Sequence, residues 1–175
     1  MTYWTHIMGG AVAGSIIVMS SDVSQTEDML IMSGAIVGSL LPDIDHRQSK
    51  ISRSSAVASL TSFITSIFSK HRGALYTPFF IMIIYIASIF ITLWMPMQFQ
   101  TAGKLIFAGL IPGMWSHIVL DTLNPGGIMW LYPLKKKYIH ILKIRTGSLL
   151  EIAGASILAV LLYILVYKGG MLNGM

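Results

Sequence analysis

The sequence has 175 residues, of which 54 % are hydrophobic and only 11 % are charged, and its mean hydropathy is +0.72. This composition is that of a membrane protein rather than of a domain with an ordinary charged surface, and we expect one integral membrane domain, residues 1–175. The absence of cysteine excludes disulfides and thiolate metal sites. The formal charge of +5 could suggest nucleic acid, but in a membrane protein the distribution of charge matters more than its sum, and no nucleic-acid partner is expected.

The first half of the chain contains two short apolar runs, 7–19 and 29–41, which we interpret as helices separated by a polar loop at 20–28. Both runs are short for a membrane span, so tilting or partial insertion is possible. Gly9, Gly10 and Gly14 would allow the first helix to pack closely against a neighbour. Basic residues then flank a Ser-rich amphipathic stretch, 55–69, which is typical of an interfacial helix.

The second half predicts three further spans. The run 74–95 is uncharged and near the length that crosses a bilayer, and 96–104 reads as a brief turn. A fourth span is expected at 105–120 and a fifth from 148 to 167. Between them lies a loop, 122–147, with a basic run that we interpret as a determinant of topology.

The basic residues predict the orientation of these five spans. With the N-terminus inside, the loops 42–73 and 122–147 are cytoplasmic, and they hold ten of the twelve basic residues. The expected fold is therefore an all-α membrane protein with about five transmembrane or membrane-embedded helices plus one interfacial helix. A multi-pass protein of the bacterial cytoplasmic (inner) membrane is expected.

Ionisable residues cluster where the second apolar run ends, directly after Pro42, at Asp43, Asp45 and His46. The whole chain has only seven acidic residues and five histidines, so this clustering asks for a chemical reason. Aspartate and histidine are ligands for Zn²⁺, Mn²⁺ and Fe²⁺. The alternative is a polar helix end with an Asp-rich turn after proline.

A second pair, His117 and Asp121, has the i, i+4 spacing that aims two helical side chains at one point. These residues could bind a divalent ion, or a histidine–aspartate hydrogen bond could close the helix end. The predicted threading brings eight candidates to the cytoplasmic face. They are His6, Asp43, Asp45, His46, His71, His117, Asp121 and Glu151.

Several ionisable residues have simpler interpretations than metal binding. His6 and His140 read as interfacial residues. His71 with Arg72 could be a ligand and a phosphate-binding fork, or part of a basic loop that faces lipid headgroups. Glu151 completes a capping box that starts at Ser148, and from spacing alone the cap is favoured.

The combination of motifs resembles a known family. After an early histidine the chain reads G-S-L-L-P-D-I-D-H, then H-R-G, then S-H-I-V-L-D-T-L-N-P-G-G with L-Y-P-L, and finally R-T-G-S-L-L-E. These blocks, from His6 to Glu151, resemble the YdjM-like family of bacterial inner-membrane proteins, described as metal-dependent hydrolases. The resemblance implies that His6, Asp43, Asp45, His46, His71, His117 and Asp121 are metal ligands, with Glu151 in the last block.

One position departs from the family pattern. Relatives commonly have a second histidine where this chain has Tyr76. The protein could therefore hold one ion fewer, bind a different substrate or lack activity, and Tyr76 could contact substrate or donate to a metal ligand. A more distant similarity to zinc-dependent phospholipase C and P1-type nucleases suggests phosphoester hydrolysis.

The sequence thus predicts a zinc-dependent hydrolase, with Mn or Fe as alternatives, acting on a phosphoester of a membrane lipid or lipid-linked substrate. Asp45 or Asp43 would be the general base, and Arg72 would hold the phosphate. The alternatives are a transporter of metal ions or protons, and a metal-stabilised scaffold without catalysis. The transporter ranks lower because the third and fifth spans contain no ionisable residue at mid-bilayer depth.

Overall fold

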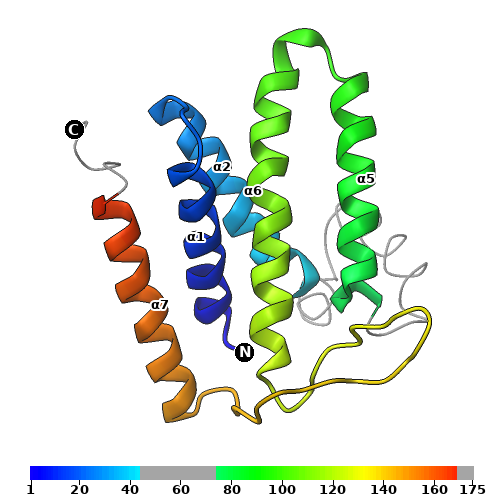
Figure 1. Ribbon diagram of the computed structural model, residues 1–175, viewed down its shortest axis with the longest axis vertical. Helices are drawn as coiled ribbons and strands as arrows, with labels where there is room; N and C mark the ends of the chain where they lie inside the picture. Colours follow the sequence, from blue (N-terminus) through cyan, green and yellow to red (C-terminus); the bar gives the residue numbers. More distant parts are fainter. Residues whose placement is uncertain (44–73, 169–175) are drawn as a thin grey trace, which may run out of the picture.

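The computed structural model describes residues 1–43 and 74–168, and Figure 1 shows that these form a bundle of helices. Two short 3₁₀ turns and one isolated bridge complete the regular structure of the described residues. The all-helical prediction is confirmed for these residues, whereas the predicted interfacial helix at 55–69 lies outside them. The helices are α1 (Tyr3–Met19), α2 (Gln25–Leu40), α5 (Pro78–Trp94), α6 (Met97–Thr122) and α7 (Leu149–Lys168).

Two of the helices, α6 and α7, are long and apolar enough to cross a membrane. The apolar helices α1 and α5 have 17 residues each. At about 1.5 Å per residue they measure about 25 Å, which is shorter than a hydrocarbon core of about 30 Å. By length and composition these two helices are candidate spans, and the crossing of the membrane by any of the helices stays a prediction.

Two predicted boundaries are wrong. The segment 97–104 is not a turn, because α6 begins at Met97 directly after Pro96. A proline has no amide hydrogen and is poorly placed inside a helix, but it is well tolerated just before one. The segment 25–28 is likewise helical, because the Ser24 amide donates to the Glu27 carboxylate (2.8 Å) in a capping box that starts α2.

The closest contact in the bundle joins α2 to α6, and glycines four residues apart on each helix create it. A Cβ added at Gly113 would lie 2.1 Å from the carbonyl oxygen of Ala35, and one at Gly109 would lie 1.9 Å from that of Ile31. Gly34 and Gly38 approach α6 equally closely from the other side. The two backbones therefore touch directly, as small residues permit in membrane helices.

The other helices assemble around this pair. Helix α1 packs on α2, α6 and α7, and α5 packs on α6 through a core that contains Ile81, Met114 and Ile118. Figure 1 shows that the start of α1, the end of α6 and the start of α7 lie at the same end of the bundle, in the lower part of the view. This end carries the candidate functional residues.

Candidate metal centre

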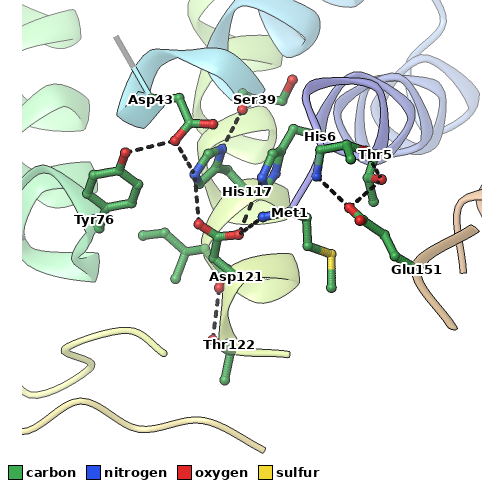
Figure 2. A network of polar contacts seen from close by, with 12 residues as sticks. Met1, Thr5, His6, Ser39, Asp43, Tyr76, His117, Asp121, Thr122 and Glu151 are labelled. Atoms are coloured by element: carbon green, nitrogen blue, oxygen red, sulfur yellow. Dashed lines mark hydrogen bonds and ion pairs between the residues drawn. The ribbon is translucent and has the colours of Figure 1, made fainter. Parts of the chain in front are cut away.

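Two histidines from opposite ends of the sequence stack at the centre of the candidate site. His6 comes from the first turns of α1 and His117 from the last turns of α6, and both are completely buried. Their ring centroids are 3.9 Å apart and the ring planes differ by 15°. Figure 2 shows the two rings side by side above Asp121. Packing of α1 against α6 therefore creates a pair that is 111 positions apart in the sequence.

Asp121 joins both rings. Its Oδ1 lies 3.3 Å from His6 Nε2, and its Oδ2 lies 3.4 Å from His117 Nε2. The i, i+4 spacing on α6 aims His117 and Asp121 at the same point, as the sequence predicts. The Asp121 side chain is 15 % exposed, so the group opens to the surface on this side.

The orientation of His117 is fixed by α2. Its Nδ1 donates to the backbone carbonyl of Ser39, with 2.6 Å between nitrogen and oxygen. A neutral imidazole that donates through Nδ1 keeps a free lone pair on Nε2, the atom that faces Asp121. Ser39 is next to Gly38, so the close contact of α2 with α6 also brings this carbonyl to His117.

Three ring nitrogens in this buried group lack hydrogen-bond partners among the described residues: both nitrogens of His6, and Nε2 of His117. Leaving a buried polar atom without a partner costs about 1–3 kcal/mol, so such atoms usually have a ligand. One ligand atom from each of His6, His117 and Asp121 lies within 4.8 Å of the others. The donor set of two imidazoles and a carboxylate suits a borderline divalent ion.

Two separations in this group, each ending on a different oxygen of Asp121, are compatible with such an ion. Two ligands of a tetrahedral zinc ion, each bound at about 2.0–2.1 Å, lie about 3.4 Å apart. The separations of 3.3 Å and 3.4 Å between nitrogen and oxygen match that value. A backbone carbonyl on the far nitrogen of a ligating histidine is the usual support for such a ligand, and His117 has it. His6 has no equivalent partner among the described residues.

Asp43 and Tyr76 border the group on the opposite side of His117. Asp43, in the 3₁₀ turn after α2, has its Oδ1 3.8 Å from His117 Nε2 and accepts a hydrogen bond of 2.7 Å from the Tyr76 hydroxyl. Its side chain is 34 % exposed. In Figure 2, Tyr76, Asp43 and His117 form one connected line of polar contacts. Tyr76 is thus a donor to a carboxylate at the edge of the group.

Glu151 lies apart from the histidine pair and ties α7 to α1. Its carboxylate accepts hydrogen bonds from the Thr2 amide, from the Thr5 hydroxyl (3.0 Å) and from the Gly147 amide (2.6 Å). The residue is 3 % exposed, and its own amide donates to Ser148 Oγ (3.3 Å), which is one half of the expected capping box. Glu151 therefore holds the first turn of α1 through Thr2 and Thr5, and Thr5 directly precedes His6.

The remaining predicted residues lie elsewhere, and two contacts of the site were not predicted from the sequence. Asp45, His46, His71 and Arg72 lie outside the described residues, and their roles stay predictions. His140 is exposed in the segment between α6 and α7. The Ser39 carbonyl could not be found from residue types, because any residue would supply it. Thr5 was equally hidden, since a lone threonine beside an interfacial histidine carries no signal.

One cationic group already contacts the Asp121 carboxylate. The Met1 amino group lies 2.9 Å from Asp121 Oδ1. A carboxylate between two buried rings and an amine concentrates negative charge where positive groups meet it. The arrangement can therefore hold a cation, and its Asp43 and Asp121 side chains are partly exposed.

Comparisons with known proteins agree over nearly the full length of the chain. The family model described as "YdjM inner membrane protein" matches residues 1–173. The uncharacterized protein YvsG of Bacillus subtilis (strain 168) is 32 % identical over 174 residues, which cover 98 % of this chain and 99 % of that protein. No solved structure matches the chain.

Proposed function

The chain belongs to the YdjM inner membrane protein family, and from that premise we propose that it is a membrane-bound, metal-dependent hydrolase whose ion is held by His6, His117 and Asp121. One observation carries this proposal: two buried ring nitrogens without hydrogen-bond partners, Nε2 of His6 and Nε2 of His117, converge on the Asp121 carboxylate. Zinc is the ion that the donor set and its spacing favour, with manganese and iron as alternatives. Such an ion supplies a water nucleophile at neutral pH and polarises a phosphoryl oxygen.

The residues around the ion have separate roles in this proposal. Ser39 holds His117 in the tautomer that presents Nε2, and Asp121 binds between the rings. Asp43 is the general base, because it is partly exposed, lies beside His117 and is oriented by Tyr76. Glu151 positions α1 and is not a ligand, since three donors already occupy its carboxylate.

We further propose that the substrate is a phosphoester of a lipid or lipid-linked molecule. The group lies at one end of the bundle beside the ends of α6 and α7, the two helices long enough to cross a membrane. A substrate that is itself anchored in the bilayer can reach this position without leaving the membrane surface. In this proposal Arg72 binds the phosphate, and the additional ligands are Asp45, His46 and His71. The site faces the cytoplasm.

Elemental analysis of detergent-purified protein tests the ion. We expect stoichiometric zinc, manganese or iron in the wild type, and its loss in Asp121→Asn, which keeps the shape of the side chain but removes its charge. Asp22→Asn is the matched control, because Asp22 is an exposed aspartate in the loop before α2. No metal in the wild type after supplementation, or equal metal in both variants, would refute the proposed centre.

Hydrolysis is tested separately on protein that carries its metal. We expect Asp43→Asn to retain the metal and its folding but to lose turnover in a screen of phospholipid and polyprenyl phosphate substrates. A variant that retains full turnover would exclude Asp43 as the base. Loss of thermal stability on metal removal, with no turnover of any phosphoester by the wild type, would point instead to a scaffold stabilised by the ion.

A further inference from the structure

The segment that joins α6 to α7 has a defined shape. Ile128 and Ile139 pair through two backbone hydrogen bonds of 2.9 and 2.8 Å, and the Ile141 amide donates to the carbonyl of Thr122 (2.9 Å). Ile128 is 1 % exposed and joins the core beside Met114. The segment is therefore fastened to the last turn of α6 rather than suspended between the helices.

Its outer surface combines apolar side chains with positive charge. Leu134 is 89 % exposed and Ile141 is 73 % exposed, and Leu131 and Leu142 are half exposed. All five lysine and arginine residues between α6 and α7 are exposed. The sequence from 122 to 150 contains no aspartate or glutamate. We call residues 131–145, which carry these side chains, the basic segment.

The position of the basic segment between α6 and α7 indicates that it lies at the membrane surface. Helices α6 and α7 are the two described helices that are long and apolar enough to cross a membrane, and the segment connects the end of one to the start of the other. A connection between two spans lies at the membrane surface. There, lysines favour the phosphates of anionic lipids, and exposed leucine and isoleucine side chains favour the ends of the acyl chains.

We propose that the basic segment is a docking surface for anionic phospholipid headgroups, with Leu134 and Ile141 inserted below the phosphates. This role does not depend on the hydrolase proposal. It goes beyond setting the topology, because it requires the folded segment to distinguish one lipid class from another. Each lysine near an anionic surface favours association by about fivefold, so Lys135, Lys136 and Lys137 together contribute roughly a hundredfold.

A fluorescent probe at residue 134 tests this proposal. The chain has no cysteine, so Leu134→Cys provides a single labelling site for an environment-sensitive dye. We expect the emission to shift to shorter wavelength, and quenching by doxyl-labelled lipid to increase, when nanodiscs contain phosphatidylglycerol in addition to phosphatidylcholine. High salt should reverse much of the change, because it screens surface charges.

Two controls separate the charge effect from simple immersion of the dye. Replacing Lys135, Lys136 and Lys137 with glutamine in the labelled protein should abolish the response to phosphatidylglycerol. Met97→Cys places the dye at the α5–α6 turn, where Met97 is 88 % exposed at the other end of α6, and should show little response. Equal emission and quenching at residue 134 in both lipids would overturn the proposal, as would a response that survives the triple substitution. A segment that binds an acidic protein or nucleic acid instead would give the first of these results.

Discussion

Replacement of Gly113 by alanine tests whether direct contact between α2 and α6 holds the site together. The new Cβ would lie 2.1 Å from the Ala35 carbonyl oxygen, about 1 Å inside the closest approach that carbon and oxygen tolerate. A backbone oxygen cannot turn away as a flexible side chain can, so the helices must separate by about 1 Å. The distance from His117 Nδ1 to the Ser39 oxygen, now 2.6 Å, would then exceed the hydrogen-bonding range.

The energetic cost has two parts. Overpacking of a tight core costs about 1–3 kcal/mol, and an unpaired buried imidazole nitrogen costs about 1–3 kcal/mol more. Alanine recovers about 0.5–1 kcal/mol through its better helix propensity. We therefore expect Gly113→Ala to lower the free energy of unfolding by about 3 kcal/mol, together with a loss of metal affinity because His117 is no longer oriented.

Thermal and denaturant unfolding in detergent, with metal titration, measure these effects. Gly154→Ala is the matched control, since Gly154 is a helical glycine in α7 with nothing within 4 Å of the added Cβ. That variant should be as stable as the wild type or slightly more stable. Equal stability and equal metal affinity of the two variants would refute the reasoning that the glycine contact positions the site.

Two further substitutions separate residues that bind the ion from residues that position others. Tyr76→Phe removes the hydroxyl that orients Asp43, the proposed base, and should lower the turnover of the metal-loaded protein by about 10-fold, with little change in metal content or unfolding; unchanged turnover would leave Tyr76 without a role at the centre. Glu151→Gln places an amide among three donors and should reduce the free energy of unfolding by about 1–3 kcal/mol while the metal content stays constant. Loss of metal at unchanged stability would instead make Glu151 a ligand.

The helical class and the rough positions of the helices could be predicted because apolar runs are local features. Boundaries depended on less visible signals. The Ser24–Glu27 capping box extends α2 into a polar stretch, and Pro96 directly precedes the first residue of α6 rather than opening a long turn. In both cases the prediction of a loop or turn gave too much weight to local polarity, although the same residues carry a helix-start signal.

The site likewise has features that local sequence predicts and features that depend on how the helices pack. The pairing of His117 with Asp121 follows from helix geometry, which spacing reveals. The burial of His6 against His117 depends on how α1 packs on α6, and no local pattern records that contact. The glycine pairs of α2 and α6 have the four-residue spacing of a packing motif, but spacing alone does not say which helices meet.

The contact of α2 with α6 also bears on how the protein is assembled during synthesis. Roughly 80 residues separate the end of α2 from the end of α6, and ribosomes need roughly 4–16 s to add them. During that interval α1 can already pair with α2 through Gly10 and Gly14, but the face of α2 that receives α6 stays uncovered. Packing of α6 against α2 brings in His117 and Asp121 in the same event, so the histidine pair and its carboxylate form only after α6 has joined α1 and α2.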